Sequence, residues 1–117
     1  MFDVNMKYYI YIIYSKRSSL FYIGHTQDPE RRLSEHNSSL YNTYTSKYRP
    51  WVLVALFYCT ESRSEAIKVE RFIKKQRSKH LINKLIEPDF TPVGKLAQLI
   101  RIPHKQDPAQ VSISQLG

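Results

Sequence analysis

The residues best suited to chemistry lie in a short stretch where a predicted strand gives way to a predicted helix. Tyr22-Ile23-Gly24 ends a run of strand-forming residues, and Arg32 and His36 follow, four residues apart, on the helix that should come next. Side chains four residues apart share one face of a helix. The spacing therefore presents a guanidinium and an imidazole side by side directly after the strand, which is suited to binding an anion.

Local signals mark the start of this helix. Asp28 suits the N-cap, Pro29 suits the first helical position, and Glu30 favours the positive end of the helix dipole. Leu33 is the one apolar residue between positions 29 and 37. The helix therefore cannot dock through a wide hydrophobic stripe of its own.

The preceding chain predicts a β-hairpin. Residues 8–14 are an unbroken run of strand formers, residues 16–19 suit a loop, and residues 20–24 return as a second strand. A four-residue loop places Tyr11 opposite Gly24. Because side chains alternate along a strand, one face then carries Tyr9, Tyr11, Ile13, Leu20, Tyr22 and Gly24. Two phenols line the face from which the helix departs, and Gly24 leaves open space beside Tyr11.

A polar, tyrosine-rich segment over residues 38–50 is predicted to be a loop. Its hydroxyls, amides and cations, among them Lys47 and Arg49, suit contact with a sugar-phosphate backbone and with bases. Its tyrosines equally suit a cover for the edge of the sheet. Residues 51–59 are predicted to form a third, buried strand.

A helix from Ser62 to about Arg77 carries a carboxylate on its apolar side. Ser62 as N-cap, with Glu65 three residues later, fits a capping box. The apolar arc consists of Ala66, Ile67, Val69, Phe72 and Ile73. At about 100° per residue, Glu70 falls within that arc. A carboxylate is costly to bury alone, so Glu70 must pair with a cation, a hydrogen-bond donor or a metal ion.

The C-terminal third of the chain changes in character. Between Arg71 and Lys84 there are six basic residues and no acidic one. Such a basic run is usual for a solvated helix face, but the absence of acidic residues favours a surface that binds along the phosphates of a nucleic acid. We expect a domain over residues 1–87 and an extension over residues 88–117, with one short helix near residues 96–100 and a mobile end.

Length and charge restrict the class of protein. The 117 residues carry a formal net charge of +8, which suits one domain that binds polyanions, nucleic acid first and an anionic membrane second. Charge that serves solubility alone is the alternative. The single cysteine, Cys59, excludes an internal disulfide and favours a reducing cytoplasm. The apolar runs are strand-sized and no signal peptide opens the chain, so no membrane association is expected.

The order of these residues resembles the GIY-YIG nuclease superfamily. Tyr9-Ile10-Tyr11 corresponds to the first motif of the family, and Tyr22-Ile23-Gly24 corresponds to the second. Arg32 and Glu70 follow in the same order as in the family. The chain looks most like the small standalone bacterial members, which are related to the N-terminal domain of the excinuclease C subunit. The departures are Tyr9, where the first motif normally has glycine, and His25, at a position where members vary.

The resemblance implies an α/β fold with a small three-stranded antiparallel β-sheet flanked by α-helices. It further implies a GIY-YIG catalytic domain over residues 1–87 that hydrolyses DNA phosphodiesters with one Mg²⁺ or Mn²⁺ ion. Carried over residue by residue, the catalytic positions are Tyr11, Tyr22, Arg32 and His36, and the metal ligand is Glu70. Contacts with the substrate are expected from Gly24, His25, Lys47, Arg49 and Asn83.

These roles agree with what phosphodiester hydrolysis requires. A divalent ion on Glu70 supplies a Lewis acid, and Arg32 offers a planar fork that matches phosphate oxygens. Tyr11 could accept a proton from the attacking water, but a phenol has a reference pKa of about 10. The metal ion, Arg32 or His36 must therefore favour the phenolate. Tyr22 could position water or phosphate.

Three functions remain open from the sequence. The first is a Mg²⁺-dependent DNA endonuclease, with structure-selective cleavage in DNA repair or processing and a separate specificity or repair partner. The second is a nucleic-acid-binding module of the same fold that does not cleave. The third is a protein-interaction domain whose basic helix meets an acidic partner.

Overall fold

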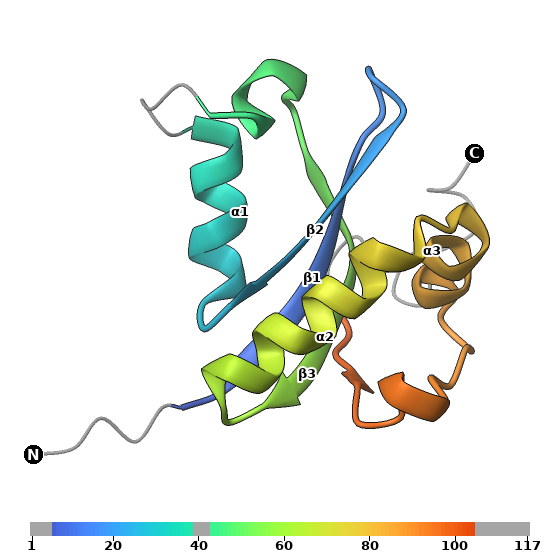
Figure 1. Cartoon of the computed structure of the whole chain (residues 1–117). Helices are drawn as coiled ribbons and strands as arrows, with labels where there is room; N and C mark the ends of the chain where they lie inside the picture. Colours follow the sequence, from blue (N-terminus) through green and yellow to red (C-terminus); the bar gives the residue numbers. More distant parts are fainter. Residues whose placement is uncertain (1–5, 39–42, 105–117) are drawn as a thin grey trace, which may run out of the picture.

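The computed structural model describes residues 6–38 and 43–104, which fold around a four-stranded antiparallel sheet (Figure 1). Along the chain the elements are β1 (Tyr8–Ser15), β2 (Leu20–Thr26), α1 (Pro29–Ser38), η1 (Thr45–Tyr48), β3 (Val52–Thr60), α2 (Arg63–Gln76), α3 (Lys79–Ile86), η2 (Gly94–Leu96) and β4 (Ile100–Arg101), where η marks a 3₁₀ helix. The strand order is β2-β1-β3-β4, so β2 is an edge strand. Within the described residues, no helix is both long and apolar enough to cross a membrane.

The α/β class is confirmed, but the expectation of three strands is wrong because β4 adds a fourth. β4 pairs with the open edge of β3, with Arg101 opposite Phe57 and Ile100 opposite Tyr58. The short helix expected near residues 96–100 is also wrong. Leu96 ends a single 3₁₀ turn, and the chain then extends into β4.

The first part of the C-terminal extension packs onto the rest of the chain. The Arg101 guanidinium donates hydrogen bonds to the carbonyls of Leu85 at 3.0 Å and Ile86 at 3.1 Å, which ties β4 to the end of α3. Leu96 and Leu99 are buried in the main core. The mobile end predicted for the chain falls on residues 105–117, outside the described residues.

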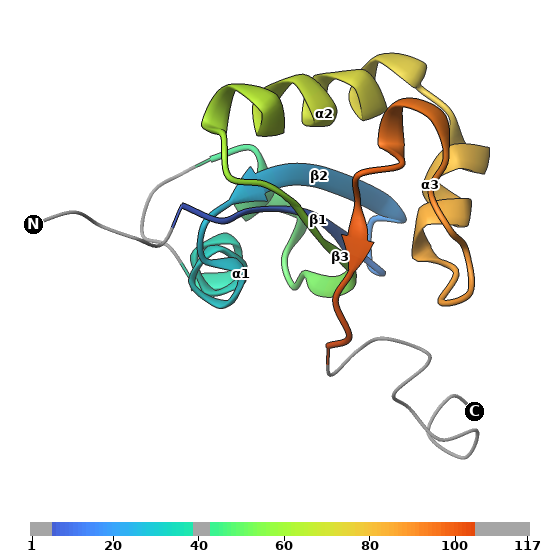
Figure 2. The same ribbon diagram turned by 90° about the horizontal axis from the view of Figure 1, so that it is seen from below.

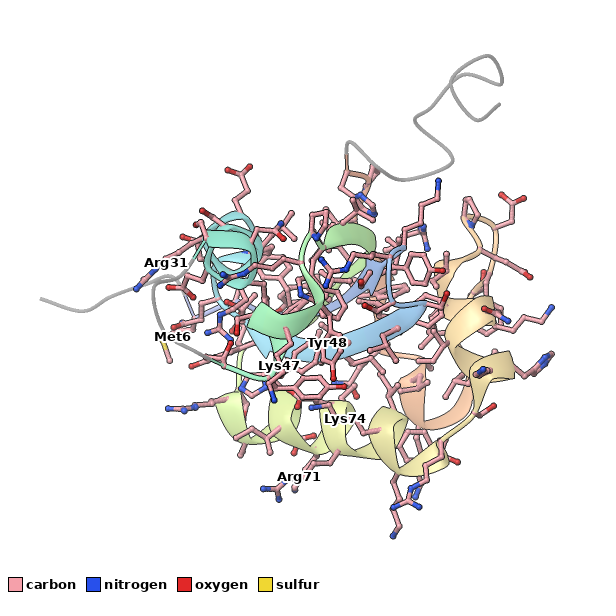
Figure 3. All side chains as sticks on the ribbon, turned by 90° about the horizontal axis from the view of Figure 1, so that it is seen from above. Met6, Arg31, Lys47, Tyr48, Arg71 and Lys74 are labelled. Atoms are coloured by element: carbon pink, nitrogen blue, oxygen red, sulfur yellow. The ribbon has the colours of Figure 1, made fainter. Side chains whose placement is uncertain are left out.

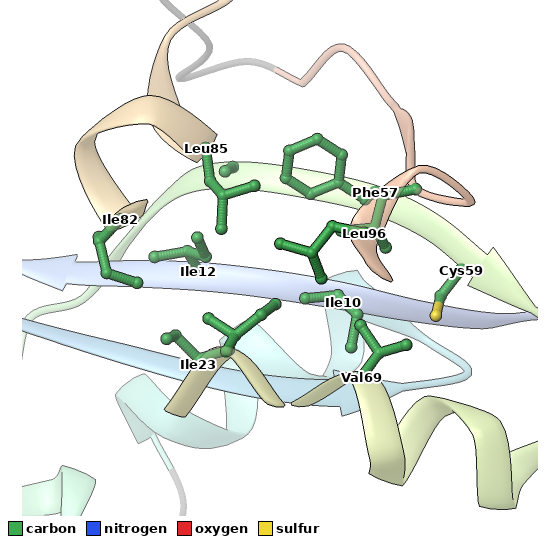
Figure 4. Packing of buried hydrophobic residues seen from close by; sticks show 12 residues of the cluster. Ile10, Ile12, Ile23, Phe57, Cys59, Val69, Ile82, Leu85 and Leu96 are labelled. Carbon is green, nitrogen blue, oxygen red and sulfur yellow. The ribbon is translucent and has the colours of Figure 1, made fainter. Parts of the chain in front are cut away.

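The predicted hairpin register is confirmed, and it divides the side chains between two faces of the sheet. Tyr11 lies opposite Gly24. On one face, Tyr11 packs with the apolar residues Ile13, Trp51, Leu53 and Leu56, and with Leu33 of α1. On the other face, Ile10, Ile12 and Ile23 pack with Val69 and Ile73 of α2 and with residues of α3 (Figure 4). Figure 2 shows the result: α1 and α2 cover opposite faces of the sheet.

The helix starts follow the predicted caps. The Asp28 carboxylate accepts the Arg31 N–H at 3.2 Å, and Ser62 Oγ accepts the Glu65 N–H at 3.3 Å. α2 ends at the left-handed residue Arg77, with φ of 47°. As the sequence predicts, α1 has no wide hydrophobic stripe: none of its residues is buried, and Leu33 is its one apolar contact with the core.

Candidate active site at the edge of the sheet

A polar cleft of about 480 Å³ opens at the β2 edge of the sheet. Six of the residues selected from the sequence line it: Tyr11, Tyr22, Gly24, His25, Arg32 and Glu70. Because β2 is the outermost strand, side chains from α1 on one face and α2 on the other can reach the same edge (Figure 2). The cleft therefore joins residues that belong to opposite layers of the fold.

Gly24 makes room for the Tyr11 side chain. A Cβ atom at position 24 would lie 2.5 Å from Cζ of Tyr11, far inside ordinary van der Waals contact. The phenol therefore occupies the space that a side chain at Gly24 would fill. Tyr11 is only 3% exposed, yet it reaches the cleft at the edge strand.

A chain of hydrogen bonds runs from Tyr11 away from the cleft. The Tyr11 hydroxyl lies 2.8 Å from Nε2 of His36, and Nδ1 of His36 lies 2.8 Å from Oγ1 of Thr45. Burial, with a contribution from Arg32, lowers the pKa of His36 to about 4, so the imidazole is neutral at pH 7. A neutral imidazole has one donor and one acceptor nitrogen. The arrangement in which Tyr11 donates to Nε2 and Nδ1–H donates to Thr45 satisfies every group in the chain.

Arg32 favours the Tyr11 phenolate, as expected, but in the chain by itself its effect is smaller than that of burial. Burial raises the pKa of Tyr11 above its ordinary value, and the nearby Tyr22 adds to this. Arg32 lowers the pKa of Tyr11, but by less than burial and Tyr22 raise it. Since His36 is neutral, it supplies an acceptor for the phenolic proton and not a positive charge.

Polar contacts at its C-terminal end hold α1, and with it His36, in place. Asn37 and Trp51 exchange two hydrogen bonds, of 2.7 and 2.9 Å, between the Asn37 side chain and the Trp51 backbone. Nε of Arg49 donates to the His36 carbonyl at 2.6 Å. Arg49, predicted to contact substrate, thus supports the position of His36.

Arg32 stands between the cleft and a second hollow of about 520 Å³ beside η1. Nε of Arg32 donates to a Glu35 carboxylate oxygen at 3.2 Å. The second hollow is also lined by Tyr22, His36 and Tyr44. Arg32 is therefore placed where one guanidinium can face both spaces.

Glu70 lines the cleft and is held there as a carboxylate. It is 16% exposed, and it accepts hydrogen bonds from Nδ1 of His25 at 2.5 Å and from Nζ of Lys74 at 2.7 Å. Burial opposes its ionisation, but the two donors outweigh burial and hold its pKa below the usual range. Of the three partners that the sequence left open for Glu70, the structure shows a cation and a hydrogen-bond donor.

The donor set also suits a divalent ion. Glu70 is an ionised, largely buried carboxylate that faces a polar cleft and already requires compensating positive charge. Among the described residues, no group of three or more His, Cys, Asp or Glu side chains could enclose a metal. An ion held at Glu70 would therefore take most of its ligands from water and substrate, which is the usual manner of Mg²⁺.

Comparison with known proteins shows the family of this chain. Residues 7–85 match the model of the GIY-YIG catalytic domain. The chain belongs to the GIY-YIG family. The match covers β1 through most of α3, which includes every residue that lines the cleft.

The chain is similar to two groups of relatives. A UPF0213 protein of Enterococcus faecalis is 43% identical over 70 residues, covering 58% of this chain and 77% of the relative. A UPF0213 protein of Listeria welshimeri is 38% identical over 81 residues, covering 69% and 88%. Structure-specific endonuclease subunit SLX1 of Candida glabrata is 43% identical over 76 residues, covering 53% of this chain but 24% of the relative. The chain thus spans less than a quarter of that SLX1 protein.

The remaining selected residues lie apart from the cleft of this GIY-YIG domain. Lys47 is exposed on η1, and Asn83 is exposed on α3; neither lines the cleft. Cys59 is buried as predicted, and burial raises the pKa of its thiol to about 11.

Some residues in and around the site were not selected from the sequence, among them Lys74, Arg63 and Thr45. Lys74 follows Glu70 by four residues, and Arg63, which lines the cleft, precedes it by seven. Both spacings return to the same face of a helix, so the positions could have been found once Glu70 was chosen. Thr45 carried no such signal, because its bond to His36 depends on how η1 packs against α1.

Proposed function

We propose that this GIY-YIG domain is a DNA endonuclease that hydrolyses phosphodiester bonds with one divalent ion, Mg²⁺ or Mn²⁺. The observation that carries the proposal is the convergence of Tyr11, Arg32 and Glu70 on one polar cleft at the β2 edge. The name of the SLX1 relatives, structure-specific endonuclease subunit, supports it.

Arg32 binds the scissile phosphate in this proposal. Its guanidinium lines the cleft and is oriented by Glu35. A guanidinium pairs with phosphate oxygens through two parallel hydrogen bonds and stabilises the charge that grows on them during hydrolysis. Glu70 would hold the ion on the other side of the cleft, where it supplies Lewis-acid stabilisation of the same phosphate.

Tyr11 and His36 provide a route for the proton of the attacking water. Tyr11 accepts that proton as its own passes along the 2.8 Å hydrogen bond to Nε2 of His36. The low pKa of His36 in the free protein is partly due to Arg32. A bound phosphate would neutralise Arg32 and favour the charged imidazole, so substrate binding would make His36 a better proton acceptor.

Basic and aromatic side chains extend this surface beyond the cleft. A third hollow, of about 300 Å³, shares Tyr22 and Tyr44 with the second and is also lined by Lys74, Arg77 and Lys79. Figure 3 looks onto this side of the molecule, where Lys47 and Tyr48 of η1 and Lys74 of α2 lie. Cations that contact phosphates and rings on which bases stack are what a nucleic-acid path requires.

The proposal includes a partner that directs cleavage. The SLX1 relatives are named as subunits, and the matched region is 24% of the Candida glabrata protein. A separate protein would then supply the selection of a branched or flapped DNA. A cytoplasmic location remains a prediction from the single cysteine.

The test is cleavage of supercoiled plasmid and of flapped DNA in the presence of Mg²⁺, Mn²⁺ or a chelator. We expect nicking that depends on the ion, that Glu70→Ala abolishes, and that Tyr11→Phe lowers by about 10² to 10⁴. Tyr14→Phe is the matched control, because Tyr14 lies on the same strand, stacks with Phe21 and does not line the cleft. Undiminished cleavage by Glu70→Ala would contradict the proposed site. Salt-sensitive DNA binding without cleavage under any metal would support the non-cleaving module instead.

A further inference from the structure

We propose that His25 is a second protein ligand of the divalent ion, and that this domain therefore binds Mn²⁺ in preference to Mg²⁺. The inference rests on the proposed ion at Glu70 and concerns what else holds it. Its basis is the contact between Nδ1 of His25 and Oε1 of Glu70, which are 2.5 Å apart, and both residues line the cleft. The two side chains are 24% and 16% exposed, so both are accessible to an ion from the cleft but largely removed from solvent.

The fold places His25 beside Glu70 through strand alternation. Ile23 of β2 packs with Val69 and Ile73 of α2, whereas Gly24 faces Tyr11 on the other side of the sheet. The residue after Gly24 therefore returns to the face that α2 covers. A residue on a strand is held more rigidly than one on a loop, so the imidazole is already in position before an ion arrives.

The separation of the two donor atoms fits ligands of one ion. Two neighbouring ligands at about 2.1 Å from an octahedral ion are about 3 Å apart. The 2.5 Å between His25 and Glu70 would have to increase by less than 1 Å. The ion would replace the shared hydrogen bond, and the imidazole would then carry its proton on Nε2.

A mixed nitrogen and oxygen site selects differently from carboxylate and water alone. Mg²⁺ favours oxygen ligands and keeps several of its waters, whereas first-row transition ions accept imidazole nitrogen readily. Replacing one water by the His25 nitrogen should therefore strengthen Mn²⁺ binding more than Mg²⁺ binding. The residue that would give this preference for Mn²⁺, His25, stands directly after the second family motif, Tyr22-Ile23-Gly24.

A purely structural role for His25 predicts the opposite result. In that case His25, like Lys74, only donates a hydrogen bond to Glu70 in the free protein and must leave when an ion binds. Removing the imidazole would then remove a competitor, so Mn²⁺ and Mg²⁺ would both bind more tightly. The two roles are therefore separated by the sign of the change in affinity.

The experiment is Mn²⁺ binding to the full chain without DNA, followed by electron paramagnetic resonance and by competition with Mg²⁺. We expect pulsed spectra with a directly coupled nitrogen in the wild type. In His25→Phe the nitrogen signal should disappear, and Mn²⁺ affinity should fall by at least about tenfold, the smallest loss seen when even a supporting group of a metal site is removed. Mg²⁺ affinity should change much less. His80→Phe, at an exposed position of α3, is the matched control and should resemble the wild type.

Two results would overturn the proposal. The first is a wild-type spectrum without nitrogen coupling, together with loss of Mn²⁺ binding in Glu70→Ala. This result does not depend on whether a His25 variant folds. The other is equal or tighter Mn²⁺ binding by His25→Phe. If instead Glu70→Ala binds Mn²⁺ like the wild type, the ion site of the proposed function is itself wrong, which is a distinguishable outcome.

Discussion

Replacing Gly24 by alanine tests whether the edge-strand glycine positions the Tyr11 phenol. The added Cβ would lie 2.5 Å from Cζ and 2.8 Å from Cε2 of Tyr11, whereas ordinary contacts lie between 3.4 and 4 Å. Tyr11 must therefore shift by roughly 1 Å. It is 3% exposed and packed against Ile13 and Leu56, so the shift disturbs the core, and overpacking of this kind costs about 1–3 kcal/mol.

The same shift acts on the hydrogen bond between Tyr11 and His36. A bond of 2.8 Å does not keep its length and direction when the hydroxyl moves by about 1 Å. Misplacement of a reacting group on this scale can lower a rate by about 10². We therefore expect Gly24→Ala to lose both stability, measured by urea unfolding, and nicking activity, measured at a temperature where the variant is folded.

Gly94→Ala is the control for Gly24→Ala. Gly94 has φ of +61° and no neighbour within 4 Å of a built Cβ. Its substitution should cost about 1 kcal/mol through backbone strain alone and leave nicking unchanged. A Gly24→Ala protein with wild-type stability and activity would refute the reasoning that Gly24 exists to admit Tyr11.

Three further predictions concern groups in and around the site. Folding lowers the pKa of His36 from 6.5 to about 4, so the unfolded chain takes up the proton first as the pH falls. Urea unfolding should therefore show a loss of stability between about pH 6.5 and pH 4. In His36→Gln this loss should be smaller. Thr45→Val leaves Nδ1–H of His36 without its acceptor and should destabilise by about 1–3 kcal/mol in the same assay, with Thr45→Ser restoring the wild-type value. Cys59, 4% exposed and with its pKa raised to about 11, should react with a thiol reagent at pH 8 far more slowly in the native protein than in urea; equal rates would contradict its burial.

Local geometry was predictable wherever strand alternation or helix capping decides it. The loop between β1 and β2 fixed the register that puts Tyr11 opposite Gly24. The caps at Asp28 and Ser62 set the starts of α1 and α2. Glu70 was found because a carboxylate in an apolar arc is expensive unless it has a partner.

Features that depend on tertiary packing were not predictable in the same way. β4 has two residues, too few to show a period, and it forms because the edge of β3 and the end of α3 accept Arg101. The sequence also did not reveal that Glu70 approaches from the face opposite to α1. The electrostatics of Tyr11 and His36 follow from burial, which the residue types alone do not fix.

The most direct test of the site is a crystal structure of Tyr11→Phe with Mn²⁺ and an uncut flapped DNA, using the anomalous signal of the metal. The account predicts one ion bound to Glu70 and a phosphate held by Arg32 in the cleft beside Gly24. An ion away from Glu70, or DNA bound on another face with the β2 edge empty, would contradict it.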